Sequence, residues 1–573
     1  MIGRVLGGLL RLVGIILVAP FVLLWWLFRA RVPRTTVLEI DLVQGIAEHQ
    51  PADPLAAIMS RSKLLVREVV IALQRAADDD RVRSVLIRGS TEGISFGLVD
   101  DLREAILHFR SKGKRVTFFA NSFGTTGPGH ATYYLATACD RIYLLPSGML
   151  GLTGLRADVV FFRDLLDRLG VLPRLDQRHE YKNAANVLTE REMTEAHREN
   201  VRQVLVGVFD QIAEATASAR NIDANDARTI ISSGPYMAHE AVARGLVDGA
   251  RYLNDVYDVL REEHDEGLRF LPVRNYLQQS APLFRRGPSV ALIHGNGVIK
   301  QGENSPRSVM GTPTMGAETI CRALRDATDD ARVKAIIFRV DSPGGSYDAS
   351  DAIAHEVKRA REAGKPVVVS MATVAASGGY FVSMEANKIL AHPLTLTGSI
   401  GVVSGKMVVR PLLERLGITT DSVDIGENPT VWSPMEDYSP EEWQRHGEIL
   451  DHIYSDFSGR VAARRGLSAE EIDRAARGRV WTGNAAREHR LIDEMGGLLS
   501  ALRVVREEIG LPEDASLQLR LFPERDWKDA FKKRSTASRP HALADLARLA
   551  EPALRDLSRQ PFSLMMPFGD RLQ

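Results

Sequence analysis

The chain has 573 residues, too many for one compact hydrophobic core, so two or three domains are expected. Its 73 Lys and Arg residues balance 73 Asp and Glu residues, which leaves no global charge to attract nucleic acid or an acidic polymer. The two cysteines, Cys139 and Cys321, show neither a CxxC pattern nor a metal-type spacing to histidine, which disfavours a disulfide framework or a zinc site.

The N-terminus carries a segment of membrane type. The run LVGIILVAPFVLLWWLF (residues 12–28) contains no charge, and extending it back to Val5 makes it long enough to span a bilayer. Trp25 and Trp26 stand where an interfacial aromatic belt would lie. A cleavable signal peptide is the competing interpretation, but residues 1–34 contain no convincing small-x-small cleavage site. We therefore expect an uncleaved transmembrane helix within residues 1–34, with an orientation that the flanking basic residues leave open.

The rest of the chain contains an internal repeat. DDDRVRSVLIRG (residues 78–89) is echoed by DDARVKAIIFRV (329–340), and YYLATACDRIYLLPSGMLGLTG (133–154) by YFVSMEANKILAHPLTLTGSIG (380–401). A third pair, GPYMAHEAVARGLVDG (234–249) and GRVWTGNAAREHRLIDEMGG (478–497), keeps nearly the same spacing. These echoes indicate a duplicated domain.

Each repeat opens with a short apolar strand, VLEIDL in the first and VALIHG in the second, after which helical segments alternate with β-branched runs. Continuous apolar strands separated by helices indicate a mainly parallel sheet that is covered on both faces and wound by right-handed crossovers. The sequence therefore predicts an α/β protein of two tandem domains. Their expected ranges are 35–272 and 290–520, joined by a linker at 273–289 and followed by a tail at 521–573.

Two capping boxes predict helix starts late in the second repeat. Ser439 and Glu442 flank Pro440 and open a long helix that runs to about residue 463. Ser468 and Glu471 repeat the same signal one helix later.

The segment AIIFRVDSPGGS (residues 335–346) ends an apolar strand in a proline and two glycines, directly before a helical segment. Adjacent glycines let the backbone turn sharply and point its amides at a ligand, and a helix N-terminus favours negative charge. A phosphate would suit this geometry, but neither GxGxxG nor GxxxxGK[ST] is present, which disfavours a nucleotide site. Taken alone, the segment is typical of an ordinary tight turn.

A second turn of this kind, MATVAASGGY (residues 371–380), changes the interpretation. Two such turns on neighbouring strands would place Ser377 opposite the amides of Gly344 and Gly345, and these amides and that of Gly378 would form an oxyanion hole. A serine beside such donors is a candidate nucleophile that needs a base. The alternative is a small residue required for packing between strand and helix.

Two kinds of base remain open for this serine. No GxSxG elbow surrounds it, but a triad through a histidine such as His392 stays possible, because triad members converge only in the fold. A lysine is the other solution, since burial in an apolar site lowers its pKa far enough for it to act near neutral pH.

The motifs SPGGS, ASGGY and LTGSIGV, in a duplicated chain with an N-terminal membrane segment, resemble the long form of the bacterial signal peptide peptidase A family of serine-lysine peptidases. The resemblance covers residues 37–497 and implies a Clp protease and crotonase-like fold. In that family the first repeat supplies the lysine and the second the serine. The Tyr-Lys-x-Ala pattern in EYKNAAN points to Lys182 as the base, and Ser399 in LTGSIG matches a serine that helps hold the lysine amine.

The two repeats also differ at these positions as the resemblance requires. His130 stands opposite Ser377 in the first repeat, and GENPTVW, without a lysine, stands opposite EYKNAAN in the second. From the residues alone, Lys182 would be a solvated surface lysine, because its neighbours Arg178, His179 and Glu180 look exposed.

The resemblance implies a membrane-anchored serine endopeptidase that hydrolyses remnant signal peptides and other hydrophobic peptides without a metal or cofactor. It also implies a homotetramer on the bacterial cytoplasmic membrane, held in the lipid bilayer by the N-terminal helix, with its catalytic domains on the extracytoplasmic side. One alternative is a crotonase-like enzyme that acts on acyl thioesters, binds coenzyme A and does not need Ser377 or Lys182. Another is a non-catalytic membrane scaffold.

Overall fold

The computed structural model describes residues 31–50, 62–89, 94–125, 127–264, 267–282, 287–305, 313–523 and 562–565. The expected transmembrane segment and most of the predicted tail lie outside these residues. Within the described ranges, no helix is both long enough and apolar enough to cross a membrane.

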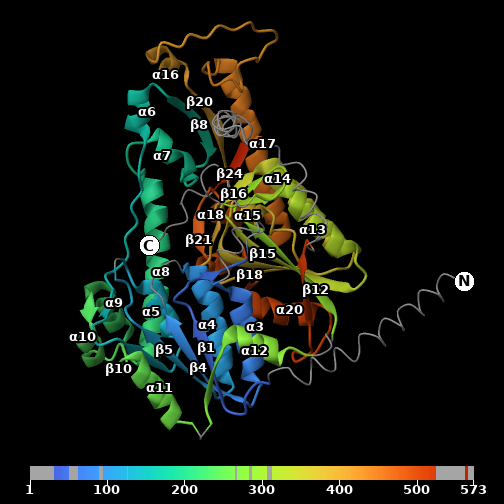
Figure 1. Cartoon of the computed structure of the whole chain (residues 1–573). Coiled ribbons are helices and arrows are strands. Elements are labelled where there is room, and N and C mark those ends of the chain that lie inside the picture. The colour runs from blue at the N-terminus through green and yellow to red at the C-terminus, as the bar shows by residue number, and fades with distance from the viewer. Residues whose placement is uncertain are drawn as a thin grey trace, which may run out of the picture.

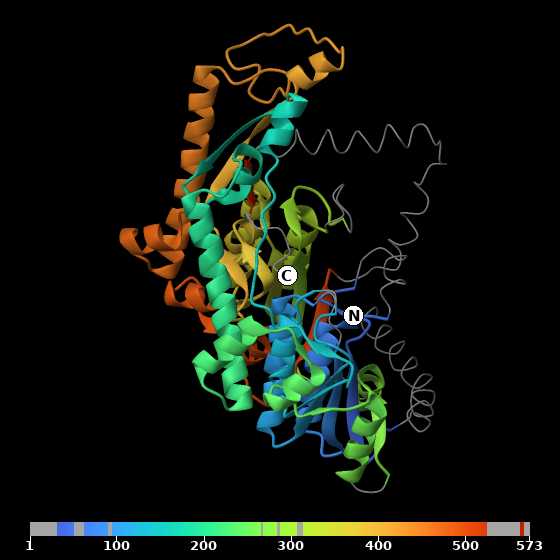
Figure 2. The same ribbon diagram turned by 90° about the vertical axis from the view of Figure 1, so that its left-hand side faces the viewer.

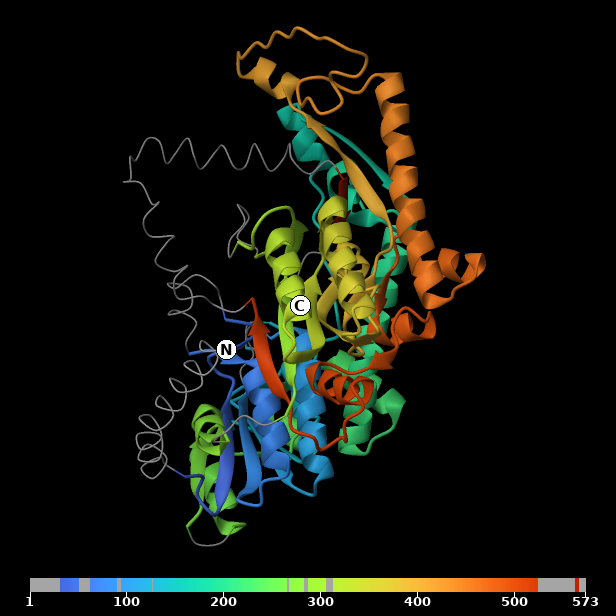
Figure 3. The ribbon, with the colours of Figure 1, turned by 90° about the vertical axis from the view of Figure 1, so that its right-hand side faces the viewer.

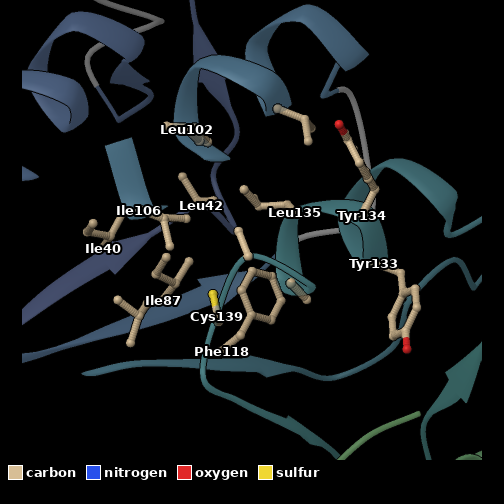
Figure 4. Close-up of a cluster of buried hydrophobic side chains, with 14 of the residues drawn as sticks. Ile40, Leu42, Ile87, Leu102, Ile106, Phe118, Tyr133, Tyr134, Leu135 and Cys139 are labelled. Atoms are coloured by element: carbon tan, nitrogen blue, oxygen red, sulfur yellow. The ribbon is translucent and has the colours of Figure 1, made fainter. Parts of the chain in front are cut away.

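The first repeat forms a six-stranded sheet in the order β10-β6-β5-β4-β1-β11, in which all neighbours are parallel. Its strands are β1 (Thr36–Asp41), β4 (Val82–Gly89), β5 (Arg115–Ala120), β6 (Arg141–Leu144), β10 (Gly249–Ala250) and β11 (Arg269–Pro272). One face packs on α3 (Val66–Ala77), α4 (Phe96–Ser111) and α5 (His130–Ala136), and the other on α11 (Leu253–Glu262). In Figure 4, Leu102 and Ile106 of α4 face Ile87 and Phe118 of the sheet.

The second repeat builds the same sheet again. Its strands β22-β18-β17-β15-β12-β23 correspond in order to β10-β6-β5-β4-β1-β11, and β19 and β21 extend it beyond β17. The strands are β12 (Ser289–Asn296), β15 (Val333–Ser342), β17 (Val367–Ala376), β18 (Lys388–Ala391), β19 (Leu396–Gly398), β21 (Val480–Thr482), β22 (Glu494–Met495) and β23 (Gln518–Phe522). The echoed segments 78–89 and 329–340 contain β4 and β15, so the sequence repeat falls on matching strands. The predicted mainly parallel α/β architecture is confirmed.

Helices cover both faces of the second sheet. Figure 3 shows α13 (Ala317–Asp329) and α14 (Tyr347–Glu362) over one face, and α20 (Leu498–Glu508) packs on the other. The other helices of this repeat are α15 (Gly378–Phe381), α16 (Arg410–Arg415), α17 (Pro440–Arg465), α18 (Ala469–Ala475) and α19 (Gly483–Glu488). Both predicted capping boxes are confirmed: Ser439 and Glu442 close one around the start of α17, and Ser468 and Glu471 close the other at α18.

The two repeats stack one above the other and are joined by shared structure (Figure 1). Five side chains of the second repeat belong to the hydrophobic core of the first: Val374, Ala376, Leu394, Leu396 and Val480. Helix α8 (Glu195–Arg220) runs alongside both repeats, touching α5 of the first and β21 of the second (Figure 2). Helix α20 lies between α3 and α4 of the first repeat and the second sheet.

A third sheet joins the repeats above the second sheet, in the order β14-β13-β16-β24-β20-β8 (Figure 1). It contains β8 (Leu172–Arg178), β13 (Val298–Lys300), β14 (Thr314–Gly316), β16 (Gly344–Ser346), β20 (Val402–Val408) and β24 (Phe562–Met565). β8 of the first repeat pairs antiparallel with β20 of the second along its whole length. This pairing carries the segment that follows β8 into the second repeat.

The smaller elements complete the chain. They are β2 (Ile46–Ala47), β3 (Leu64–Leu65), β7 (Met149–Leu150), α6 (Arg163–Leu169), the 3-10 turn η1 (Asn183–Ala185), α7 (Asn186–Thr189), α9 (Ala224–Ser233), β9 (Tyr236–Met237) and α10 (Ala238–Ala243). The segment predicted as a linker, 273–289, begins with a further helix, α12 (Val273–Ser280). Val273 and Tyr276 of α12 are buried in the core of the first repeat, so this part of the predicted linker is packed structure.

Candidate active site

Ser377 lies at a sharp turn between a strand and a helix. β17 ends at Ala376, α15 begins at Gly378, and Ser377 between them has φ +57° and ψ −116°, a region that side-chain-bearing residues rarely adopt. The turn is held because the Ser377 amide donates to Gly398 O (2.8 Å) and the Phe381 amide donates to Ser377 O (2.9 Å). A strained residue held from both sides projects its side chain in one fixed direction.

The small residues that follow Ser377 are required by close packing. A Cβ on Gly378 would lie 2.8 Å from Ser350 Oγ, and a Cβ on Gly379 would lie 2.5 Å from Ser342 O. Neither position has room for a side chain, since real Cβ atoms do not approach so closely. The glycines therefore bring the turn of Ser377 directly against the end of β15 and the start of α14.

Lys182 reaches this turn from the first repeat. Its Nζ lies 2.7 Å from Ser377 Oγ, 2.8 Å from Ser399 O and 3.0 Å from Ser399 Oγ. The side chains of Lys182, Ser377 and Ser399 are all fully buried. The structure thus brings together the predicted nucleophile, the predicted base and the predicted supporting serine.

The chain turns inward between the exposed Glu180 and the buried Lys182. Arg178 is half-buried and pairs with Asp176 and Asp451, whereas Glu180 is exposed and pairs with Arg477. The backbone of Lys182 itself packs so tightly on Gly478 that a Cβ there would lie 2.4 Å from the Lys182 nitrogen. The interpretation of Lys182 as a surface lysine is therefore wrong, because Tyr181, Lys182 and Asn183 are all buried.

Burial lowers the pKa of Lys182 well below its usual range, since the charged form loses its hydration there. A neutral amine has two N–H donors and one lone pair. The carbonyl and hydroxyl oxygens of Ser399 can accept the two N–H bonds, which leaves the lone pair for the hydroxyl proton of Ser377. Both N–H groups and the lone pair of the neutral amine then have a partner, and the lone pair faces the hydroxyl of Ser377.

The glycines of β16 supply amides beside the serine. Gly344 and Gly345 both have positive φ, +111° and +154°, which glycine adopts without strain. A Cβ on Gly378 would lie 3.1 Å from the Gly345 nitrogen, so the two glycines are in contact. The Gly344 amide donates to Ser342 Oγ (3.1 Å), which leaves the amides of Gly345 and Gly378 as the candidate oxyanion donors.

His392, the alternative base, belongs to a different cluster. It is buried between the repeats, and its Nε2 lies 3.1 Å from Asp101 Oδ1 and 3.8 Å from a carboxylate oxygen of Glu104. Burial would lower the pKa of His392, but the neighbouring carboxylates outweigh that effect and raise it to about 9. A charged histidine held in this way is poorly suited to act as a base at neutral pH.

The side chains of Asp101, Glu104 and His392 lie close enough to bind a metal ion, but their oxygens already have partners. Asp101 accepts from the Leu498 amide (2.9 Å), and Glu104 accepts from the amides of Gly497 (2.9 Å) and Ser500 (2.9 Å). The two carboxylates therefore cap the N-terminus of α20, which is where acidic groups are stabilising.

Sequence reasoning missed the buried charges that join the repeats. Arg339 of β15 is fully buried, and it donates from Nε to Glu48 (2.9 Å), from a terminal nitrogen to Ser370 Oγ (2.8 Å), and to Asp101. Burial of Arg339 opposes its charge, but Asp101 and Glu48 outweigh that effect and raise its pKa. A charged residue inside an otherwise apolar strand, AIIFRV, was the one signal that could have indicated this network.

Comparison with known proteins places the chain in a family. Residues 108–266 and 359–511 match the profile of Peptidase family S49. Serine protease SPPA, chloroplastic, from Arabidopsis thaliana is 29% identical over 453 residues, which cover 78% of this chain and 66% of that protein. Protease 4 from Haemophilus influenzae is 30% identical over 476 residues, covering 80% of this chain and 75% of that protein. Protease 4 from Salmonella typhi is 31% identical over 454 residues, covering 77% and 71%. The chain belongs to Peptidase family S49 and is a serine-type peptidase.

Proposed function

We propose that the protein is a membrane-anchored endopeptidase with a serine-lysine dyad, in which Ser377 is the nucleophile and Lys182 the general base. The observation that carries this proposal is the 2.7 Å separation between Lys182 Nζ and Ser377 Oγ inside a fully buried site. A lysine can act as a base at neutral pH only where its charged form is disfavoured, and this site supplies the necessary desolvation.

The reaction would proceed through an acyl-enzyme. Lys182 takes the hydroxyl proton of Ser377 as Oγ attacks the carbonyl carbon of the scissile bond, and the resulting oxyanion accepts bonds from the amides of Gly345 and Gly378. The lysine ammonium then gives its proton to the leaving amine, and the peptide bond breaks. Water hydrolyses the ester by the same route in reverse, and Ser399 holds the lysine amine throughout.

The resemblance to signal peptide peptidase A supports remnant signal peptides and other hydrophobic peptides as substrates. The uncharged run at residues 12–28 supports an anchor in the bacterial cytoplasmic membrane, with the catalytic repeats on the extracytoplasmic side. We extend the proposal to a homotetramer on the same resemblance. Carbonate extraction of membranes tests the anchor, and light scattering of the detergent-solubilised protein tests the assembly.

Hydrolysis of a leucine-rich fluorogenic peptide tests the dyad. Ser377→Ala and Lys182→Met should each reduce kcat by at least about 10³-fold, because neither group has a substitute in the site. Matched controls are Ser383→Ala, which removes another buried hydroxyl, and Lys406→Met, which removes another largely buried lysine with a lowered pKa. If Lys182→Met keeps near-normal turnover while Ser377→Ala is inactive, another base serves the serine.

The same variants separate the rival functions. A crotonase-like enzyme would bind coenzyme A and retain its activity without Ser377 or Lys182. A scaffold would hydrolyse no peptide, and an electrophilic peptide inhibitor would form no adduct with Ser377 that intact-mass spectrometry could detect.

A further inference from the structure

A side chain of the first repeat closes one edge of the second sheet. Among the described strands, β21 pairs with β19 alone, so the main-chain groups on its other edge need partners. Helix α8 lies along this edge, so close that a Cβ on Gly207 would be 3.1 Å from Thr482 Cγ2. Asn200 lies about two turns earlier on the same face of α8 and contacts Val480 of β21.

Asn200 takes the place of a neighbouring strand. Its side-chain nitrogen donates to Val480 O (2.9 Å), and its side-chain oxygen accepts from the Val480 amide (3.1 Å). A neutral side-chain amide offers a donor and an acceptor side by side, as a main chain does. Both residues are fully buried, so water cannot replace either bond when Asn200 is removed.

Val480 is coupled to the two serines of the proposed site. It lies opposite Gly398 in the pairing of β21 with β19, and Gly398 O accepts from the Ser377 amide (2.8 Å). The residue before it, Arg479, accepts at its carbonyl oxygen from the Ser399 amide (2.6 Å), and Ser399 holds the lysine amine. A displacement of Val480 would therefore shift both serines.

The same segment also contacts the part of the chain that carries the base. Arg477 O accepts from the Tyr181 amide (3.3 Å), and Gly478 packs against the main-chain nitrogen of Lys182. Asn200 belongs to the same part of the first repeat, since α8 follows the segment of Lys182. Its two bonds to β21 therefore join the chain that supplies the lysine to the strands that hold the serines.

We propose that Asn200 is a positioning residue of the active site, which sets the separation between Lys182 Nζ and Ser377 Oγ by binding the main chain of Val480. This inference rests on the proposed function, because it assigns Asn200 a role in that dyad. A proton passes from the serine to the lysine only at hydrogen-bond distance, so a small displacement slows turnover. The loss should fall on kcat and leave KM unchanged, because Asn200 would act on the reacting groups and not on the bound peptide.

Turnover of a leucine-rich fluorogenic peptide by the full-length protein tests this role. Asn200→Leu keeps a branched side chain but makes neither bond, so kcat should fall at least about tenfold while KM stays within about twofold of the wild-type value. Gln211→Leu is the matched control. Gln211 also lies on α8 and accepts a bond from the second repeat, from Asn484 Nδ2 (2.9 Å), but this partner lies outside residues 477–480. Its kcat should stay within about twofold of the wild-type value.

Asn200→Asp supplies a readout that a general loss of stability would not produce. A protonated carboxyl group has one donor and one acceptor and can make both bonds to Val480, whereas an ionised carboxylate has no donor for Val480 O. Burial raises the pKa of a carboxyl group at this position, which favours the protonated form. The kcat of Asn200→Asp should therefore be close to that of the wild type at low pH and should fall below it as the carboxyl group ionises. Thermal unfolding over the same pH range checks that the variant stays folded.

Three results would overturn the proposal: a normal kcat in Asn200→Leu, an equal loss of kcat in Gln211→Leu, or a ratio of Asn200→Asp to wild-type kcat that does not change with pH. The dyad variants keep this inference apart from the proposed function. If Ser377→Ala and Lys182→Met retain activity, the proposed function fails. If they are inactive while Asn200→Leu turns over normally, only the role of Asn200 fails.

Discussion

Ser399→Ala tests how the lysine amine is held. The Ser399 hydroxyl is 3.0 Å from Lys182 Nζ, and the carbonyl oxygen of the same residue, at 2.8 Å, remains after the substitution. In the ground state the neutral amine loses one of two acceptors. In the transition state Lys182 becomes an ammonium with three N–H groups, and one of them then has no partner in a fully buried site.

The size of the effect follows from the difference between these two states. A hydrogen bond from a neutral donor contributes about 0.5–1.5 kcal/mol and one from a charged donor about 1.5–3 kcal/mol, so the barrier rises by about 1–1.5 kcal/mol. This corresponds to a fall in kcat of about tenfold. Because the ammonium loses more than the amine, the pKa of Lys182 falls further, and the acidic limb of the kcat profile moves to lower pH.

The assay is a profile of kcat against pH for hydrolysis of a leucine-rich fluorogenic peptide. Activity should rise with pH in the wild type as Lys182 loses its proton, and the rise should come at lower pH in Ser399→Ala. Ser399→Gly is the matched variant, because Ser399 has φ +50° and glycine removes the hydroxyl while it relaxes the backbone. An unchanged kcat, an acidic limb that moves to higher pH, or normal activity in Ser399→Gly would refute the reasoning.

Three further predictions concern the oxyanion amides and the contacts between the repeats. Gly378→Ala would place a Cβ 3.1 Å from the nitrogen of Gly345, so kcat should fall by about 10²-fold or more; a change confined to KM would contradict this. Arg339→Met removes the arginine partner that the buried carboxylates of Glu48 and Asp101 share and should lower the free energy of unfolding in urea by about 3–5 kcal/mol, whereas Arg332→Met, at a side chain that is 74% exposed, should cost less than about 1 kcal/mol. The raised pKa of His392, about 9, means that its ion pair stabilises the fold fully below pH about 6.5 and that this contribution is lost as pH rises through about 9. The free energy of unfolding should therefore fall by about 3 kcal/mol over that interval in the wild type, and an equal fall in His392→Gln would exclude this origin.

Local patterns in the sequence determined the elements of the fold. The echoes at 78–89 and 329–340 fall on β4 and β15, because strand formation depends on runs of apolar residues that the duplication kept. The capping boxes at Ser439 and Ser468 specify the starts of α17 and α18, because a cap acts within one helical turn. The glycines around Ser377 likewise marked the strand-to-helix turn at which the serine lies.

Only the tertiary structure decided which side chains meet. The residues next to Lys182 suggest an exposed segment, and the lysine is buried because β8 pairs with β20 of the other repeat and carries it to Ser377. The network of Arg339, Glu48 and Asp101 and the insertion of β24 between β16 and β20 also depend on contacts between residues far apart in the chain. A sequence pattern reflects only the residues that are close to each position in the chain. The lowered pKa of Lys182 and the insertion of β24 between β16 and β20 depend instead on desolvation and strand pairing, which segments far apart in the chain supply.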